Sequence, residues 1–474
     1  ETGPYTRCQT MNRLRSAMRK GKRARMEMGE TAKPKGKRSK TAFCFCPSEN
    51  GFIVLPGKTV DAASACTYHT FPDSADVLLR SQLLRWYDKE KRELPWRTLA
   101  MTEADLNIRT YAVWVSEIML QQTQVATVKD YYLRWMKRWP TVKALAAATL
   151  EEVNQMWAGL GYYSRGKRLH EGAQKVVTEL KGQMPQTVDS LLKQLPGVGR
   201  YTAAAIGSIA LGQVTGAVDG NVIRVLCRLR AIGADSTSPA VTEALWGLAN
   251  MLVDPERPGD FNQAMMELGA RVCTPKGPLC SQCPVQPLRP SWCDFKFLLT
   301  SSSPSGNSGT CHLCPSEPWD DELGVQNFPR KPAKKPPRVE QTLTCVVVRP
   351  GEEGEEEYLL KQRPHKGLLA GLWEFPSLLL EAENSEVKQK RALCAELNGI
   401  LGTCLTESVF QYVGEVVHIF SHIHQTYVVY SMILKDGGTE TQTEDTQWLT
   451  RSSLQEAAVS TGVKKVGMLS THCV

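Results

Sequence analysis

The segment LPGVGRYTAAAIGSIALG, residues 195–212, constrains the fold most, because two glycines interrupt an otherwise continuous helical pattern. Gly197 and Gly199 bracket Val198, and the stretches on both sides have helical periodicity. Glycine permits a tight turn, and the backbone N–H groups that begin the second helix are free to hold a phosphate. The segment therefore predicts two helices joined by a short turn. That turn is either an ordinary helix connection or a backbone site for a phosphate.

Periodicity divides the chain of 474 residues into two folded parts. From about 69 to 272 the pattern is helical, with roughly nine or ten helices, and Thr149 and Glu152 have the spacing of a capping box. Strand-like runs follow at 343–349, 357–363, 416–422 and 426–434, with one helical pattern near 385–398. We expect a basic tail over 1–68, an all-α domain over 69–293, an irregular connector over 294–340, an α/β domain over 341–460 and a C-terminal tail over 461–474.

The basic charge is concentrated near the beginning of the chain. Residues 1–40 carry thirteen Lys or Arg and three Glu, a net charge of +10, whereas the whole chain carries +8. Such a segment is typical of a disordered arm. It is either a solvated arm, a nuclear address that also contacts phosphates, or a mitochondrial presequence. We expect a protein of the nucleus, with the mitochondrion as a second compartment.

The cysteines argue against a disulfide-bonded protein, and the distribution of apolar residues argues against a membrane-spanning one. Fifteen cysteines is an odd number, and several of them cluster with metal-like spacing, which favours a reducing compartment over a disulfide framework. No run of 18 apolar residues is present, so no membrane span is expected.

Three features occur in a fixed order: the glycine turn, Asp219 in VDGNV, and the run Cys273, Cys280, Cys283. This order resembles the helix–hairpin–helix DNA glycosylases that carry an iron–sulfur loop. The segments YAVWVSEIMLQQTQVATV, MWAGLGYYSRGKRL and FNQAMMELGARVC resemble the adenine DNA glycosylases (MutY) within that class, in their mammalian form. The resemblance covers about 69–284 and 324–460. It implies a monomeric base-excision repair enzyme that removes adenine opposite 8-oxoguanine or guanine in double-stranded DNA.

Two carboxylates fit this chemistry. Breaking an N-glycosidic bond needs a proton for the leaving base and a negative group near the cationic sugar. Glu117 is a lone acid in the apolar run VWVSEIML, where burial would raise its pKa; the alternative is a surface glutamate. Asp219 is either the negative group or a helix N-cap, and the two roles are compatible. The resemblance implies that Glu117 protonates adenine N7 and later activates water, and that Tyr201 and Asn221 orient the pair.

Tyr201 separates two kinds of glycosylase. In the endonuclease III-like relatives this position is a lysine that forms a Schiff base and cleaves the strand. The tyrosine predicts a monofunctional glycosylase instead. Two rivals come from other classes: a silent DNA-binding protein that recruits partners, and a nucleotide hydrolase.

Further residues are assigned through the resemblance to contacts with DNA and the lesion. Gln122 would fill the gap left by the flipped adenine, and Tyr162 in GLGYY would insert beside 8-oxoguanine; the alternative for GLGYY is a buried aromatic pair. The adenine pocket would be lined by Trp96, Arg97 and Glu267.

The cysteine run departs from the family pattern. Cys273, Cys280 and Cys283 match three ligands of a [4Fe–4S] cluster, but the fourth position is Arg289, and the next cysteine is Cys293. Either Cys293 closes the site, or one protein ligand is missing, or the segment 285–310 differs from the functional form. Zinc is the alternative metal.

A second metal site is expected in the connector. The mammalian family binds zinc there through C-x6-C-x2-C and a distant histidine. Here Cys311, Cys314 and His69 match three ligands, whereas Pro304 replaces the first cysteine. The same connector is expected to contact an abasic endonuclease and replication or checkpoint proteins.

The α/β domain resembles a Nudix fold through HKGLLAGLWEFP. In RALCAE, Ala392 and Ala395 replace two metal-binding glutamates and only Glu396 remains, which favours recognition over hydrolysis. By resemblance, Phe420, Ser421 and His422 read 8-oxoguanine; alternatively, they are only strand residues. The family's sliding-clamp peptide is absent, so clamp binding by that route is not expected.

Overall fold

The computed structural model describes residues 69–71, 74–288, 311–314, 320–330, 336–351, 354–364, 367–380, 385–420, 422–434 and 445–470. The predicted basic tail over 1–68, the candidate ligand Cys293 and the candidate lesion contact Ser421 lie outside these residues. No helix within the described ranges is both long and apolar enough to cross a membrane.

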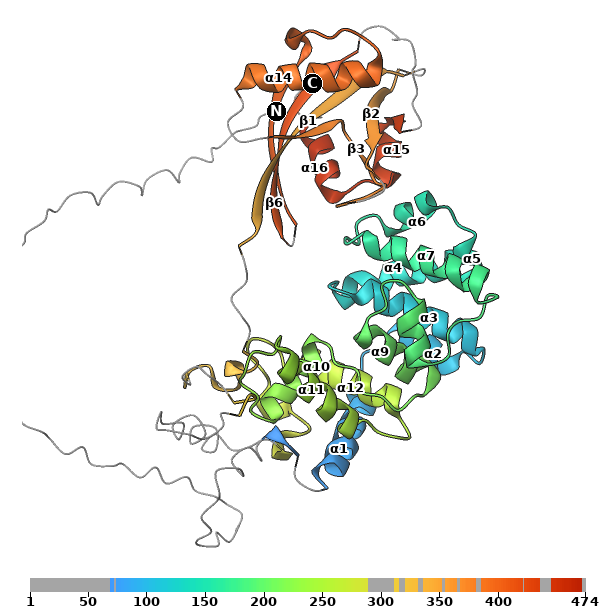
Figure 1. Cartoon of the computed structure of the whole chain (residues 1–474), viewed down its shortest axis with the longest axis vertical. Coiled ribbons are helices and arrows are strands. Elements are labelled where there is room, and N and C mark those ends of the chain that lie inside the picture. Colours follow the sequence, from blue (N-terminus) through green and yellow to red (C-terminus); the bar gives the residue numbers. More distant parts are fainter. Residues whose placement is uncertain are drawn as a thin grey trace, which may run out of the picture. The chain divides into compact units, whose positions relative to one another are not determined.

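The helical domain contains twelve α-helices among the described residues, slightly more than the periodicity suggested (Figure 1). The capping box predicted for Thr149 and Glu152 is present at the start of the sixth helix. The helices are α1 (Ala75–Glu90), α2 (Pro95–Thr102), α3 (Leu106–Leu120), α4 (Val125–Arg138), α5 (Val142–Ala146), α6 (Leu150–Trp157), α7 (Ser164–Glu179), α8 (Val188–Gln194), α9 (Arg200–Leu211), α10 (Gly220–Leu229), α11 (Pro239–Leu252) and α12 (Pro258–Arg271).

Helix α9 stands between two apolar cores of this domain. One core gathers α3 to α8 around three fully buried tryptophans, of which Trp135 meets Trp157 edge to face at 5.5 Å between ring centroids. The other core gathers α1 and α10 to α12. Ala203 of α9 belongs to the first core and Ala204 to the second, because small side chains let helices approach on both faces. The alanine-rich segment after the glycine turn therefore joins the two halves of the domain.

The glycine turn has the geometry that the sequence predicts. It connects α8 to α9, and Gly197 has a φ of +77°, a region in which side chains other than glycine are strained. Gly199 is the N-cap residue of α9. The turn therefore leaves the N-terminal N–H groups of α9 without helical acceptors, as a phosphate site requires.

The second domain is a seven-stranded sheet with helices on both faces. The strand order is β3-β2-β1-β6-β5; β1 and β6 run parallel, β4 pairs with β1, and β7 pairs with β2. The elements are β1 (Arg338–Pro350), β2 (Glu356–Gln362), β3 (Trp373–Glu374), β4 (Ser377–Leu380), α14 (Glu386–Leu401), β5 (Gln411–Ile419), β6 (Ile423–Ile433), β7 (Thr446–Thr450), α15 (Arg451–Glu456) and α16 (Thr461–Ser470).

Each face of the sheet is covered by a different helix set. Leu393 and Leu397 of α14 pack on one face, whereas α15 and α16 lie on the other (Figure 1). The predicted C-terminal tail is wrong as far as residue 470, because Val463 and Val466 of α16 are buried in the core of this domain. The predicted connector also has an anchored part, since Phe328 is buried in the core around α10 to α12.

Candidate active site

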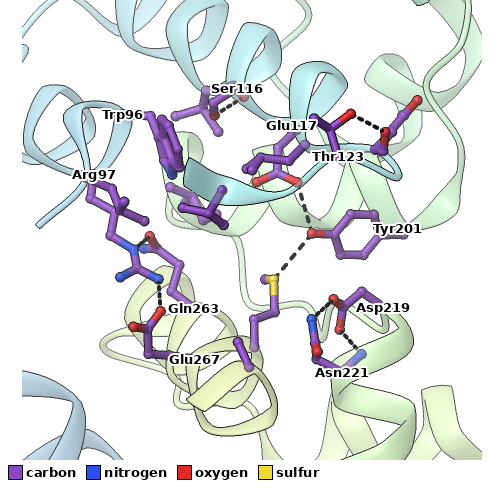
Figure 2. Close-up of a pocket in the computed structure, with 18 of the residues that line it drawn as sticks. Trp96, Arg97, Ser116, Glu117, Thr123, Tyr201, Asp219, Asn221, Gln263 and Glu267 are labelled. Atoms are coloured by element: carbon purple, nitrogen blue, oxygen red, sulfur yellow. Dashed lines mark hydrogen bonds and ion pairs between the residues drawn. The ribbon is translucent and has the colours of Figure 1, made fainter. Parts of the chain in front are cut away.

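A cavity of about 490 Å³ opens in the helical domain between α2, α3, α9, α10 and α12 (Figure 2). All four predicted catalytic residues line it, although they come from three different helices, α3, α9 and α10 with its N-cap residue. Its lining includes Trp96, Arg97, Glu117, Tyr201, Asp219 and Glu267. The fold thus brings together residues that lie up to 171 positions apart in the sequence.

Glu117 is the central acid of this cavity. Its side chain is 5 % exposed on α3, and the Tyr201 hydroxyl donates a hydrogen bond of 2.9 Å to its Oε2 (Figure 2). Burial raises the pKa of Glu117 to about 7, and the hydrogen bond from Tyr201 opposes part of that shift. The predicted surface alternative is therefore wrong, and the carboxyl group is protonated in a large fraction of molecules at neutral pH.

Asp219 is the N-cap of α10, one of the two roles that the sequence left open, and it also lines the cavity. As the N-cap of α10, its Oδ1 accepts from the backbone N–H groups of Asn221 and Val222 at 2.9 and 2.8 Å. Its Oδ2 accepts from Asn221 Nδ2 at 2.8 Å (Figure 2). Burial raises the pKa of Asp219, while these hydrogen bonds favour the ionised form. The cap fixes the carboxylate rigidly at the cavity wall.

Asn221 and Arg224 connect this carboxylate to the cysteine loop. Arg224 donates to Asn221 Oδ1 at 2.7 Å through Nη2 and to the backbone carbonyl of Cys273 at 2.7 Å through Nε. The Arg224 side chain was not identified from the sequence, because nothing in its local pattern distinguishes it from other helical arginines. The orientation of Asp219 therefore depends on a chain of hydrogen bonds that ends at the first cysteine.

An ion cluster forms the far wall of the cavity. Glu267 is fully buried and binds Arg92 at 2.7 Å and Arg97 at 2.8 Å. Burial raises its pKa, but the two arginines outweigh this and hold the pKa of Glu267 below its usual value. Arg97 also donates to Gln263 Oε1 at 3.0 Å. Trp96 and Arg97 lie where they were predicted, whereas Arg92 and Gln263 were missed; Gln263 precedes Glu267 by one helical turn.

The two predicted wedge residues share an unusual backbone conformation. Gln122 has a φ of 55° and Tyr162 a φ of 48°, both in the left-handed region that strains residues other than glycine. Both side chains are exposed, and Tyr162 is 43 % exposed, so the alternative of a buried aromatic pair holds for Tyr163 and not for Tyr162. Such strain at exposed residues is typical of sites that contact a ligand.

The cysteine loop encloses a small apolar cavity. Cys273, Cys280 and Cys283 line it together with side chains such as Val225 and Leu268. Three thiols on one cavity wall offer ligands either to an iron–sulfur cluster or to a zinc ion. The fourth predicted ligand, Cys293, lies outside the described residues.

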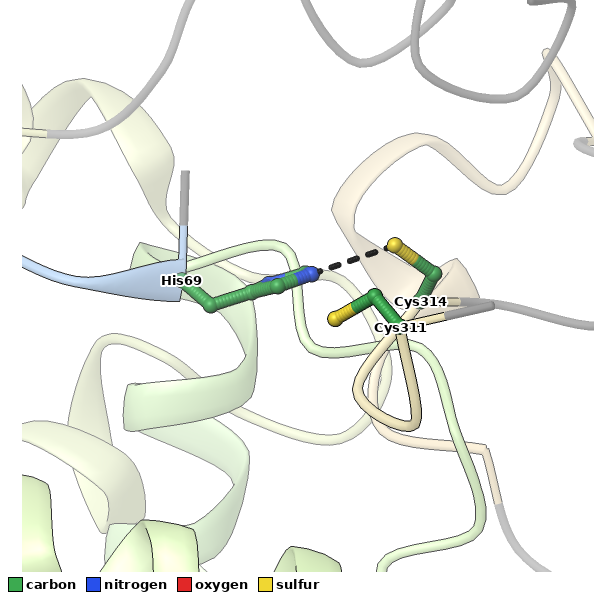
Figure 3. Close-up of side chains that lie close together, drawn as sticks. All are labelled: His69, Cys311 and Cys314. Carbon is green, nitrogen blue, oxygen red and sulfur yellow. Dashed lines mark hydrogen bonds between the residues drawn. The ribbon is translucent and has the colours of Figure 1, made fainter. Parts of the chain in front are cut away.

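His69, Cys311 and Cys314 lie together as the connector spacing predicted (Figure 3). Their ligand atoms are all within 4.8 Å of one another, and His69 Nε2 is 3.3 Å from Cys314 Sγ. His69 Nδ1 donates to the Arg230 carbonyl at 2.9 Å, which leaves Nε2 as the atom with a free electron pair. Burial lowers the pKa of His69, which also favours the neutral ring. This donor set fits a zinc ion with one further ligand.

The second domain has lost the metal site of Nudix enzymes. Glu396 of α14 binds Lys361 of β2 at 2.6 Å, and Ala392 and Ala395 offer no carboxylate. At the end of β5, Phe420 packs edge to face against His418 at 4.5 Å between ring centroids. The residue that follows the gap at Ser421, His422, is exposed and precedes β6. The described part of the predicted reading loop is therefore a β5–β6 turn.

Comparisons with known proteins agree with this architecture. Residues 115–251 match the family model of the HhH-GPD superfamily base excision DNA repair proteins, and residues 345–467 match that of the NUDIX domain. A solved thermostable thymine-DNA glycosylase is 26 % identical over 46 % of this chain and 95 % of its own, with a TM-score of 0.40. A solved complex of the C-terminal domain of mouse MUTYH with human PCNA is 44 % identical over 28 % and 88 %, with a TM-score of 0.26. The domains and the acid pair define a base-excision DNA glycosylase of the helix–hairpin–helix class.

Curated relatives are similar over most of the chain. The chain is 55 % identical over 472 residues to the human adenine DNA glycosylase, covering 96 % of this chain and 85 % of the relative. It is 58 % identical to the mouse enzyme over 85 % of this chain and 80 % of the relative. The chain belongs to the adenine DNA glycosylase family and is a hydrolase of base excision repair.

Proposed function

We propose that the protein removes adenine paired with 8-oxoguanine or guanine from duplex DNA, without cleaving the strand itself. The observation that carries this proposal is the buried Glu117, whose pKa of about 7 suits a general acid, in one cavity with Asp219. Arg97 and Glu267 form a polar ion pair on the opposite wall. This combination matches the needs of an adenine leaving group.

The chemical step requires one proton and one negative group. Glu117 gives its proton to adenine N7 while the N-glycosidic bond breaks. The electron pair of that bond goes to the base. Asp219 stabilises the positive charge that develops on the sugar. Glu117, now ionised, takes a proton from the water that adds to C1′, which returns it to the acid form. Tyr201 and Asn221 hold the two carboxyl groups in place through the hydrogen bonds described above.

No lysine stands at the position of the strand-cleaving nucleophile. Tyr201 donates to Glu117 there, and its raised pKa, caused mainly by burial, keeps the hydroxyl protonated. A neutral phenol hydrogen-bonded to the acid cannot form a Schiff base. This supports a monofunctional glycosylase over an endonuclease III-like lyase.

Access to the adenine requires base flipping, which costs a few kcal/mol of lost stacking and pairing. Gln122 and Tyr162 are exposed and adopt fixed, strained backbone conformations, which suits side chains that enter a base stack. The α9 N-terminus after Gly197 and Gly199 offers free N–H groups to a phosphate. These features support DNA binding with the target base turned into the cavity.

The second domain is proposed to read the 8-oxoguanine strand. Its remaining Glu396 is occupied by Lys361, so hydrolysis of a nucleotide through a bound metal has no support. Phe420 and His422 at the β5–β6 turn are the described candidates for contact with the lesion. Binding without catalysis is the role that this arrangement favours.

Two metal groups are proposed for the cysteine sites. Cys273, Cys280 and Cys283 would hold a [4Fe–4S] cluster, and His69, Cys311 and Cys314 would hold zinc. Both groups would order loops rather than take part in bond breaking. Metal analysis tests this directly: we expect iron to fall in Cys280→Ser and zinc to fall in Cys311→Ser, each without loss of the other metal.

The decisive test uses a duplex with a single A:8-oxoguanine pair. We expect adenine release and an abasic site that becomes a strand break only after alkali treatment. Duplexes with A:G and A:T pairs rank the specificity, and Glu117→Gln is the inactive control. Release of adenine at equal rates from A:T and A:8-oxoguanine would contradict the proposed specificity, and a strand break without alkali would contradict the monofunctional assignment.

A further inference from the structure

Arg165 is a buried arginine that has no acidic partner among the residues that the structure describes. It is the second residue of α7 and only 6 % exposed. Burial lowers its pKa to about 10, so the guanidinium remains charged at neutral pH. A buried charge without a counter-ion is costly unless its hydrogen bonds are satisfied. The acceptors around Arg165 therefore indicate why it is there.

The guanidinium is surrounded by acceptors from two separate segments. The first is the end of α3 and the turn after it, where Arg165 Nη1 donates to the carbonyls of Ile118 at 3.0 Å, Met119 at 2.9 Å and Gln121. Nη2 donates to Thr123 Oγ1 at 3.0 Å. Carbonyl groups at a helix C-terminus have no helical donor and carry partial negative charge, so they suit a cation.

The second segment is the glycine-rich loop between α6 and α7. Arg165 donates to the carbonyls of Gly161 at 3.0 Å, Leu160 at 3.4 Å and Tyr162 at 3.4 Å. Its guanidinium also lies 5.3 Å from the centre of the Tyr162 ring, within the range of a cation–π contact. One side chain thus holds the backbone and the ring of the same exposed tyrosine.

Each segment contains one strained, exposed residue. Gln122 lies between Gln121 and Thr123, both of which bind Arg165, and Tyr162 binds it directly. Left-handed backbone at such residues costs about 1–3 kcal/mol and persists only where surrounding contacts fix it. Arg165 supplies such contacts to Tyr162 itself and to both chain neighbours of Gln122.

We propose that Arg165 is a positioning residue that locks Gln122 and Tyr162 into one rigid unit, so that both enter the DNA stack together and turn the target adenine out. This inference rests on the proposed function, because it assigns these two residues to the DNA wedge. Arg165 touches neither the cavity nor the reacting atoms. Its effect is therefore on base flipping and not on the acid step of Glu117.

The test compares Arg165→Lys with a matched control, Arg80→Lys. Arg80 likewise donates to carbonyls at a helix end, those of Leu252 at 2.9 Å and Met251 at 2.8 Å, but it belongs to α1 and α11, outside the cavity lining. Lysine keeps the charge and loses the planar fork that binds several carbonyls at once. Single-turnover rates are measured per active site on adenine opposite 8-oxoguanine and on adenine opposite an abasic site, which has no pairing partner.

We expect Arg165→Lys to slow excision of the paired adenine roughly tenfold more than that of the unpaired adenine, and Arg80→Lys to leave this ratio unchanged. A 2-aminopurine beside the target base should report slower or weaker unstacking with Arg165→Lys. Equal slowing on both substrates, with a parental 2-aminopurine signal, would overturn the inference. If the parent protein itself releases no adenine from either duplex, the proposed function fails instead.

Hydrogen exchange on the parent protein tests whether Arg165 joins the segments of Gln122 and Tyr162 into one unit. This test does not need a folded variant. We expect the amides of residues 118–123 and 159–165 to open together, with matching protection, because one guanidinium joins them. Independent opening of the two segments would overturn the inference.

Discussion

Glu117 in the helical domain and Glu396 in the Nudix-like domain have opposite electrostatic surroundings. Glu117 in the helical domain has a hydrogen bond from a neutral phenol and no direct ion pair among the described residues, and burial raises its pKa to about 7. Glu396 in the Nudix-like domain, which stands where an active hydrolase would bind metal, is joined to Lys361 at 2.6 Å. The first carboxyl group can exchange a proton near neutral pH, whereas the second forms an ion pair with a lysine.

The difference fits the proposal that the helical domain carries a chemical site and the Nudix-like domain a binding site. A general acid must be protonated and ready to ionise at the working pH, which needs a dry environment without a counter-ion. A divalent metal site of the Nudix type needs several carboxylates, whereas Ala392 and Ala395 leave only Glu396, which is paired with Lys361. The comparison predicts that changes at Glu117 affect activity strongly and changes at Glu396 affect it little.

The largest expected effect is on adenine release. Glu117→Gln keeps the size and the polar contact to Tyr201 but cannot give a proton, so we expect the single-turnover rate to fall roughly 10²–10⁴-fold. Glu396→Gln is the control from the other domain and should retain the parental rate. Comparable losses in both variants would contradict the assignment of the chemical role to Glu117 alone.

A second effect concerns stability, and its sign follows from the raised pKa of Glu117. The folded-state pKa of about 7 exceeds the ordinary value of 4.5, so ionisation of Glu117 opposes folding. The penalty is absent below pH 4.5, grows as the pH rises to about 7, and is constant above that. Glu117→Gln, which lacks this charge, should therefore gain up to about 3 kcal/mol of unfolding free energy over the parent at pH 8, and little at pH 4.5.

Denaturant unfolding of both proteins at the two pH values measures this difference. If the gain at pH 8 equals the gain at pH 4.5, Glu117 does not titrate between these values and the assignment of its pKa is wrong.

The third effect is the pH dependence of the rate. Because the acid form of Glu117 is the active form, the single-turnover rate should fall roughly tenfold per pH unit above about 7. The Tyr201 hydrogen bond favours the carboxylate, so Tyr201→Phe should move this falling limb to higher pH. A limb that stays in place in Tyr201→Phe would show that another group controls it.

The smallest effect is expected at the ion pair of the Nudix-like domain. Lys361 and Glu396 are partly exposed, so Lys361→Met should change the unfolding free energy by less than about 1 kcal/mol. Neither Lys361→Met nor Glu396→Gln should alter adenine release from the A:8-oxoguanine duplex or produce Mg²⁺-dependent nucleotide hydrolysis. Hydrolysis by the parent that disappears in Glu396→Gln would reverse the comparison.

The two acids of the cavity were predictable from sequence because each residue stands in a distinctive local context. Glu117 interrupts an apolar helix, and Asp219 has the spacing of an N-cap before a helical run. The glycine turn and the strands β1, β2 and β6 were predicted for the same reason. Helix α16 was missed because its apolar residues are few, and only the sheet surface against which Val463 and Val466 pack makes it a buried element.

Supporting residues were not predictable in the same way. Arg92, Gln263 and Arg224 act through partners that lie 175, 166 and 49 positions away in the sequence. An arginine or a glutamine gives no local sign of such a distant partner. Arg165 is the clearest example, because its acceptors are mostly backbone carbonyls, which every residue has. No residue type in the sequence marks a carbonyl group as the acceptor for a distant guanidinium.

The sequence by itself determined the helices, the order of the motifs, the two acids and the spacing of the cysteines, since these depend on residue types and on distances along the chain. The tertiary structure alone decided the pKa of Glu117, the occupation of Glu396 by Lys361 and the joining of Gln122 to Tyr162 through Arg165. A pKa and a buried contact depend on which groups surround an atom in space and on how much water they exclude, and those neighbours are brought together only by the fold.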